Sequence, residues 1–218
     1  MFNGIDNELR KTASVLANAV REQRYGSVVF SSASRREGTT TMALNTARVL
    51  QTREGIRPLV IEVNRERPRY ARLFQLDEMR GFAAIAANEV CVLQCIQRGP
   101  YGVAVIPAGT SEKEPEMGAD VAAVLRRIVD DILSQQEDRF DIVLVDAPAF
   151  LEDPDAVTVC TVVPRLVLVV RAAHLSFEVL QRLKQEIAQS VEEFTLVGAI
   201  LNRHRQYIPG WIREWLLK

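Results

Sequence analysis

A run of small, polar and charged residues lies between a β-prone segment and a helical pattern near the N-terminus. It reads Ser32-Ala33-Ser34-Arg35-Arg36-Glu37-Gly38-Thr39-Thr40-Thr41. This position and length are typical of a loop whose backbone N–H groups, together with a helix N-terminus, hold a polyphosphate. Such a loop usually has the pattern G-x-x-x-x-G-K-[ST]. Here Ala33 replaces the first glycine and Thr39 replaces the lysine, whereas Gly38 and the hydroxyl of Thr40 are retained.

The rest of the chain shows which elements must position this loop. Continuous apolar, β-prone segments predict strands at 27–31, 58–63, 103–106, 141–145, 166–170 and 196–201. Helical spacing predicts helices at 6–22 (with Asp6 as N-cap), 40–50, 82–90, 119–134 and 176–192. Continuously apolar strands indicate a sheet covered on both faces, and such sheets are mostly parallel. The alternation therefore predicts a single doubly wound α/β domain over residues 1–218, with functional loops at the carboxyl ends of the strands.

Composition and charge exclude several classes of function. The chain of 218 residues has a net charge of -1, which gives no attraction to nucleic acid. The N-terminal segment is polar, and the apolar runs are short for a membrane span, so we expect a cytoplasmic location. The three cysteines, Cys91, Cys95 and Cys160, cannot all pair, and no His lies near the first two in sequence. We therefore expect buried apolar cysteines in a reducing compartment, without a metal site of their own.

Four further segments accompany the loop in a recognisable order. These are 59–68 (LVIEVNRERP), 105–109 (VIPAG), 140–148 (FDIVLVDAP) and 198–203 (GAILNR). In order and spacing, the segments resemble the cytoplasmic kinase domain of the bacterial tyrosine kinases of capsule and exopolysaccharide synthesis. That family belongs to the MinD/ParA-like group of P-loop ATPases. The resemblance covers about residues 6 to 203 and implies a site for ATP or ADP with Mg²⁺.

The resemblance also assigns residues to that site. It implies nucleotide binding by the loop residues Arg36, Glu37, Gly38, Thr39, Thr40 and Thr41, and by Asn202. It implies magnesium binding by Thr40 and Asp146, the latter at the end of the strand FDIVLVDAP. The corresponding catalytic positions are Thr39, Glu62, Asn64 and Asp146.

Three of those four catalytic positions carry a different residue from the family pattern. Thr39 cannot supply the positive charge that the P-loop lysine places on the transferred phosphoryl group. Glu62 replaces an aspartate and is one methylene longer, and we expect it still to reach a metal. Asn64 replaces the aspartate that activates the acceptor hydroxyl, and a neutral amide cannot accept that proton. We therefore expect a pseudokinase whose nucleotide binding is weak or absent.

Basic residues and the C-terminal tail give two further interpretations. Arg35 or Arg36 would be a substitute for the missing lysine, and Arg65, Arg67, Arg69 and Arg72 would extend a basic rim around the site. The alternative for both sets is a solvated surface. Residues 204–218 contain Trp211 and Trp215 in a helical pattern, which predicts either a helix docked on the domain or one that inserts into a partner groove or membrane interface.

Three functions follow from these observations. The first is a regulatory or scaffolding protein of polysaccharide synthesis or export, which would bind the cytoplasmic segment of a membrane chain-length regulator or export protein at the inner face of the plasma membrane. The second is an atypical but active ATP-dependent tyrosine kinase or ATPase. The third is a MinD-like positioning ATPase with a membrane-binding tail. The family also implies a homo-oligomer, although its N-terminal pattern E-x-x-R-x-x-R is replaced here by Asn7, Arg10 and Ala13.

Overall fold

A central sheet of seven strands organises the chain. In the computed structural model, which describes residues 3–24, 26–112, 120–134, 140–172, 176–191 and 193–202, the strand order is β3-β4-β2-β5-β1-β6-β7. The strands are β1 (Ser27–Ser32), β2 (Pro58–Glu62), β3 (Gln97–Arg98), β4 (Ala104–Ile106), β5 (Ile142–Asp146), β6 (Arg165–Arg171) and β7 (Thr195–Asn202). All neighbouring pairs are parallel except β3 with β4. The predicted doubly wound α/β fold is therefore confirmed.

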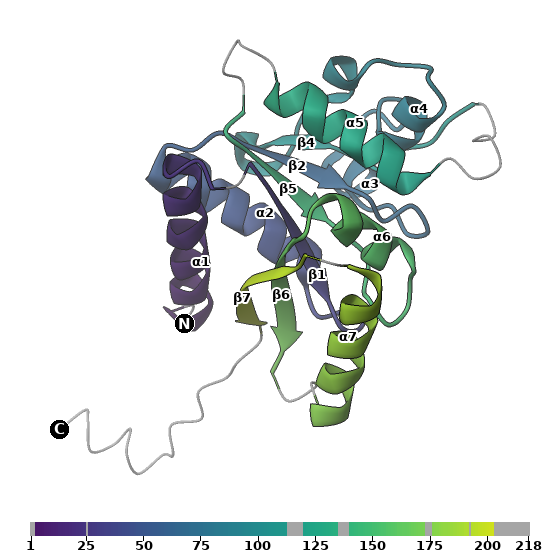
Figure 1. The fold of residues 1–218 in the computed structure, drawn as a ribbon. Coiled ribbons are helices and arrows are strands. Elements are labelled where there is room, and N and C mark those ends of the chain that lie inside the picture. Colours follow the sequence, from purple (N-terminus) through teal and green to yellow (C-terminus); the bar gives the residue numbers. More distant parts are fainter. Residues whose placement is uncertain are drawn as a thin grey trace.

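Helices cover both faces of this sheet (Figure 1). The α-helices are α1 (Asn3–Arg21), α2 (Thr39–Val49), α3 (Tyr70–Phe74), α4 (Phe82–Ala86), α5 (Val121–Leu133), α6 (Asp155–Val162) and α7 (Phe177–Ser190). Shorter helical turns are η1 (Leu50–Glu54), η2 (Val92–Cys95) and η3 (Pro100–Gly102). Helices α1 and α2 pack on one face, and α5, α6 and α7 pack on the other.

Strict alternation along the strands produces this two-sided core. In β5, Val143 and Val145 join the cluster that contains α5, whereas Ile142 and Leu144 join the cluster that contains α1 and α2. Successive side chains of a strand point to opposite faces, so a strand with both faces covered must be apolar at every position. The five residues of β5 are all buried, as this requires.

Several element boundaries differ from the sequence prediction. Helix α1 begins at Asn3, so Asp6 lies inside the helix and the prediction that it is the N-cap is wrong. Helix α4 ends at Ala86, four residues early, because the chain turns through a left-handed conformation at Asn88, whose φ is 56°. The tail 204–218 lies outside the described residues, as do residues 113–119, which include the first residue of the helix predicted at 119–134.

Helix α6 was not predicted, because its sequence DAVTVCTV is rich in β-branched residues that disfavour helix. Its start is stabilised locally, by Pro154 immediately before it and by the carboxylate of Asp153, whose Oδ1 accepts from the Asp155 N–H at 2.9 Å. Helix α3 and the antiparallel edge strand β3 were also missed, since five and two residues are too short to show a period.

The chain changes direction between two neighbouring strands of the sheet. Strand β1 continues through α2 toward β2, while β5, which pairs with β1, continues through α6 toward β6 on the other side of β1. At such a point the two connecting loops diverge and leave a crevice at the carboxyl edge of the sheet. The polar loop 32–41 and Asp146 lie at this crevice.

Candidate functional site

A cleft of about 590 Å³ opens at the carboxyl ends of the strands. It is lined by residues of the loop after β1, the loop after β2, the loop after β5 and the end of β6. The predicted site residues Gly38, Thr39, Thr40, Thr41 and Asp146 all line it. The parallel arrangement therefore brings together segments more than a hundred residues apart in sequence.

The loop after β1 has the backbone of a tight turn into a helix. Gly38 has φ 98°, a left-handed conformation that favours glycine, and it is the N-cap of α2. Arg36 also has a positive φ of 65°, which is uncommon for a residue with a side chain. Asn202, at the end of β7, fixes the loop from the other side through a hydrogen bond from its Nδ2 to the Glu37 carbonyl oxygen at 2.7 Å. Glu37 and Asn202 are both buried.

Thr39 occupies the lysine position but turns its hydroxyl into the loop. Its Oγ1 donates to Ser32 Oγ at 3.1 Å, and the Ser32 hydroxyl donates to the carbonyl oxygen of Ser34 at 2.8 Å. The side chain that should carry a positive charge into the cleft is therefore part of a neutral chain of hydrogen bonds that closes the loop on itself.

Asp146 is retained from the family pattern but is tied to a buried tyrosine. Only 3% of its surface is exposed, and its Oδ2 accepts a hydrogen bond from the Tyr70 hydroxyl at 3.0 Å. A hydrogen bond with the Thr40 side chain also reaches it. Burial raises the pKa of Asp146 from 3.8 to about 7, and the charge of Glu62 adds to this shift, whereas the hydrogen bonds and Arg69 oppose it. Burial likewise raises the pKa of Tyr70, which stays a donor.

Glu62 has a structural role, because its carboxylate is fully engaged by backbone donors. It is 1% exposed, and its two oxygens accept from the backbone N–H groups of Arg69 (2.6 Å), Tyr70 (3.2 Å) and Ala108 (3.0 Å). It thereby holds the first turn of α3 and the end of β4 together. Burial raises its pKa, and these three backbone hydrogen bonds oppose the rise. The expectation that Glu62 reaches a metal does not fit this geometry, because both oxygens already point at backbone donors.

Asn64 lines the cleft, and its side-chain oxygen accepts from the Arg67 N–H at 3.0 Å. The amide thus shapes the loop after β2. A neutral amide is not a base and cannot take the proton of an acceptor hydroxyl.

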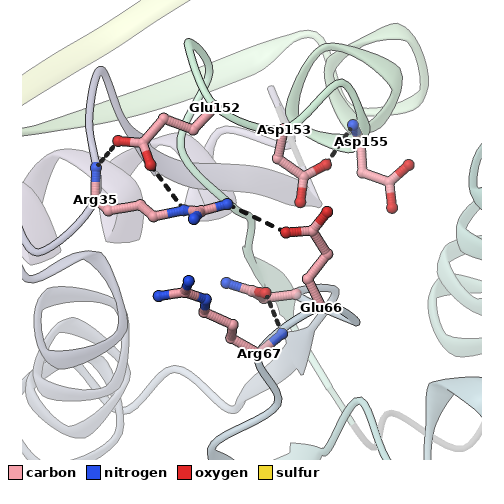
Figure 2. A network of polar contacts seen from close by, with 7 residues as sticks. Arg35, Glu66, Arg67, Glu152, Asp153 and Asp155 are labelled. Atoms are coloured by element: carbon pink, nitrogen blue, oxygen red, sulfur yellow. Dashed lines mark hydrogen bonds and ion pairs between the residues drawn. The ribbon is translucent and has the colours of Figure 1, made fainter.

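Arg35 bridges the cleft mouth through two ion pairs. Its guanidinium contacts Glu152, in the loop after β5, at 2.7 Å, and Glu66, in the loop after β2, at 3.1 Å. Its backbone N–H donates to Glu152 as well, at 2.7 Å. Figure 2 shows this bridge, with Asp153 and Asp155 lying beside it. Of the two arginines expected to replace the lysine, Arg35 is therefore already neutralised by carboxylates.

Four other arginines line the same cleft without such partners. They are Arg36, Arg67, Arg69 and Arg171. No hydrogen bond or ion pair within the described ranges engages the guanidinium of any of them, although Arg69 acts at longer range on Glu62 and Asp146. Two further members of the predicted basic rim lie elsewhere. Arg65 pairs with Asp155 at 3.1 Å, and neither it nor Arg72 lines the cleft.

The donor set does not fit a magnesium ion of the usual kind. Magnesium requires near-ideal octahedral oxygen coordination and is usually held by one or two ionised carboxylates together with substrate phosphates and waters. Asp146 already accepts hydrogen bonds from Tyr70 and Thr40. Glu62 is occupied by backbone donors. Among the described residues, no three His, Cys, Asp or Glu side chains gather as a metal-binding group.

Sequence reasoning missed three residues of this site. Arg171 could have been found, because it directly follows the predicted strand 166–170 and strand ends face the cleft. Asp153 lines the cleft and is buried, just before the unpredicted α6. Tyr70 gave no signal, since only the packing of α3 under the loop reveals that its hydroxyl reaches Asp146. Asn202, predicted to bind nucleotide, contacts the phosphate-loop backbone and does not itself line the cleft.

Comparison with known proteins identifies the fold. No protein-family model matches the sequence. No curated protein matches it at a significant level. Among solved structures, the VpsO kinase domain aligns at a TM-score of 0.69 with 21% identity, covering 94% of this chain and 100% of that one. The kinase domain of the Escherichia coli tyrosine kinase ETK aligns at 0.69 with 20% identity, covering 88% and 79%. The cell division ATPase MinD of Pyrococcus furiosus aligns at 0.66 with 21% identity, covering 88% and 80%.

The fold and the position of the cleft define the class. This chain has the doubly wound α/β fold of P-loop, MinD/ParA-like ATPases, and it shares that fold with bacterial tyrosine kinase domains. The resemblance seen in the sequence is thus confirmed at the level of fold. Within the described residues, every helix is too short or too polar to cross a bilayer.

Proposed function

We propose that this chain is a regulatory or scaffolding domain with the bacterial tyrosine kinase fold, and that it has lost phosphoryl transfer. The observation that carries the proposal is the state of the four catalytic positions. Thr39 and Asn64 are neutral, Glu62 is hydrogen-bonded to three backbone N–H groups, and Asp146 is held by Tyr70. No group at these positions is arranged to take the acceptor proton or to stabilise charge on a transferred phosphoryl group.

The proposed role is to bind a partner in exopolysaccharide or capsule synthesis or export. The fold neighbours include the VpsO and BceF kinase domains, and bacterial tyrosine kinases are the family that the sequence segments resemble. The partner we propose is the cytoplasmic segment of a membrane chain-length regulator or an export protein, which would place this domain at the inner face of the plasma membrane. Co-purification of such a segment with the domain from a common expression host tests the partner directly.

Incubation of the purified protein with ATP and Mg²⁺ tests the loss of chemistry. We expect no phosphotyrosine on the protein and no release of inorganic phosphate above background. The control is the triple variant Thr39→Lys, Glu62→Asp, Asn64→Asp, which restores the family residues. Tyrosine phosphorylation by the unmodified protein that Asp146→Asn abolishes would end the proposal.

One observation favours a second candidate, an atypical ATPase. Arg36 lines the cleft within the phosphate loop and has no carboxylate partner in the described part of the chain. This candidate predicts that the protein turns over ATP and that Arg36→Ala lowers the rate. The regulatory proposal predicts no ATP turnover by the unmodified protein. The third candidate, a MinD-like positioning ATPase, depends on the tail 204–218 outside the described residues. Liposome co-sedimentation with and without residues 207–218 decides it.

A further inference from the structure

The charge of the cleft is opposite to that expected of a metal site. Five arginines line it, against two carboxylates, Asp146 and Asp153. Both carboxylates are buried, at 3% and 7% exposure. The chain as a whole has a net charge of -1, so this excess of positive charge is local. Clefts lined by one sign of charge concentrate ions of the other sign.

The four arginines whose guanidinium groups make no hydrogen bond or ion pair with the described residues come from three separate strand ends. Arg36 lies in the loop after β1, Arg67 and Arg69 lie in the loop after β2, and Arg171 ends β6. They therefore surround the phosphate loop from several sides. The Arg67 backbone N–H is held by the side-chain oxygen of Asn64, so the position of the backbone does not depend on the guanidinium. Guanidinium groups bind phosphate oxygens in a bidentate manner and stay charged at all relevant pH values.

Like charges gathered in one cleft are unfavourable without a ligand, and here they coincide with local strain. Arg36 has a φ of 65°, which costs free energy for a residue with a side chain. The neighbouring Arg35 is neutralised by Glu66 and Glu152 and holds the cleft mouth. Within the described residues, the arginine that ties the loops together is paired with carboxylates, whereas the other four arginines that line the cleft have no such partner.

We propose that this cleft binds a di- or triphosphate group without a divalent metal, with Arg36, Arg67, Arg69 and Arg171 supplying the charge that a P-loop lysine and magnesium supply elsewhere. The inference rests on the proposed function, since it names the ligand class of the same cleft. It adds that the metal is dispensable. The carboxylates of Asp146 and Glu62 are hydrogen-bonded to Tyr70, Thr40 and backbone N–H groups, and the compensating charge comes from arginine side chains.

Calorimetric titration of the full-length protein tests this inference. The titrants are ATP, ADP and inorganic tripolyphosphate, each with magnesium and each with EDTA. We expect binding in EDTA that is as strong as, or stronger than, binding in magnesium, because a chelated metal ion neutralises the charge that the arginines recognise. Equal affinity for ATP and tripolyphosphate assigns recognition to the three phosphates, and a clear preference for ATP adds a contact to the nucleoside.

Single variants identify the groups responsible. Arg36→Gln, Arg69→Gln and Arg171→Gln are each expected to weaken binding roughly tenfold, the usual effect of removing one charge-assisted contact. Arg72→Gln is the matched control, because Arg72 is exposed on α3 and does not line the cleft. Its affinity should not change. Circular dichroism of each variant verifies that the fold is retained.

Three results would overturn the inference. They are binding that requires magnesium, affinity unchanged in all three cleft variants, and absence of binding of every titrant to folded protein at about millimolar concentration, the weak end of specific affinities. None of these contradicts the loss of phosphoryl transfer, which the phosphotyrosine assay tests separately. Conversely, measurable tyrosine phosphorylation would end the proposed function and leave the metal-free binding measurement standing.

Discussion

Asp146 is a buried carboxylate whose ionisation lowers the stability of the folded protein. Its carboxylate is buried, and burial raises its pKa from 3.8 to about 7. The folded state therefore binds a proton more tightly than the unfolded state does over this range. Stability is highest below the unfolded pKa and decreases as pH rises toward 7, because ionising the buried group costs free energy.

Asp146→Asn is accordingly expected to stabilise the protein in a pH-dependent way. The asparagine keeps the shape, and its oxygen can still accept from Tyr70, but it cannot ionise. The stability advantage of the variant should grow by roughly 2 to 3 kcal/mol between about pH 5 and about pH 8, at about 1.4 kcal/mol per pKa unit. Urea unfolding at both pH values measures this. Asp131→Asn, at an exposed position on α5, is the control, and an advantage independent of pH would contradict the assignment.

Glu62 has a structural role in the loop after β2. Its carboxylate accepts three backbone N–H groups from two loops. Glu62→Gln places a donor NH₂ against those donors, so we expect a loss of roughly 1 to 3 kcal/mol in the free energy of unfolding.

The matched control for this substitution is Glu66→Gln in the same loop. Its side chain is 61% exposed, and its ion pair with Arg35 is of the kind worth less than about 1 kcal/mol. Denaturant titration of both variants compares them. Equal effects at the two positions would show that the hydrogen bonds to Glu62 contribute little.

The element that forms the site is the turn from β1 into α2, and it depends on one glycine. Gly38 has φ 98°, and a Cβ at this position would collide with the Asn202 side-chain amide. The turn is thus constrained both by its own backbone and by the end of β7. A substitution here changes the backbone of this loop without removing a charged or hydrogen-bonding side chain from the cleft.

A pair of glycine variants separates these two constraints. Gly38→Ala carries the cost of a left-handed alanine, about 1 kcal/mol or more, plus the collision with Asn202. Gly55→Ala carries only the first cost, because Gly55 has φ 68° and a Cβ added there would meet no atom within 4 Å. We expect the larger loss of melting temperature for Gly38→Ala. Equal losses would mean that Asn202 moves aside freely.

Across the molecule, one sheet lies between two hydrophobic cores. We therefore expect the central strands of the sheet to be the last to unfold locally. Strands β1, β2 and β5 are buried at every position, whereas β7 is an edge strand with Leu196 and Leu201 substantially exposed. Hydrogen exchange by mass spectrometry should therefore show the slowest exchange in peptides from β1 and β5. Peptides from the edge strands β3 and β7 should exchange first. Protection of β7 equal to that of β5 would show that its outer edge is covered in solution.

The architecture of this protein could be predicted from its amino-acid sequence. Each buried strand is a continuous apolar run, because both of its faces are covered, and the runs alternate with helical patterns long enough to cross between parallel strands. That local signal was sufficient for six strands, for five of the helices and for the phosphate loop with its missing lysine. It also located Asp146, since a carboxylate after an apolar strand must lie at the edge of the sheet.

The roles of the site residues, in contrast, depend on tertiary contacts. The hydrogen bond from Tyr70 to Asp146, the three backbone contacts of Glu62 and the contact of Asn202 with the loop all join residues distant in sequence or on separate elements. No periodicity encodes such pairs. The same holds for the arginines: Arg35 and Arg36 are neighbours of identical type and both line the cleft, yet Arg35 is paired with two carboxylates and Arg36 with none of the described residues. The sequence gives the charge of each side chain. Whether that charge is neutralised depends on which loops the fold brings together at the carboxyl edge of the sheet.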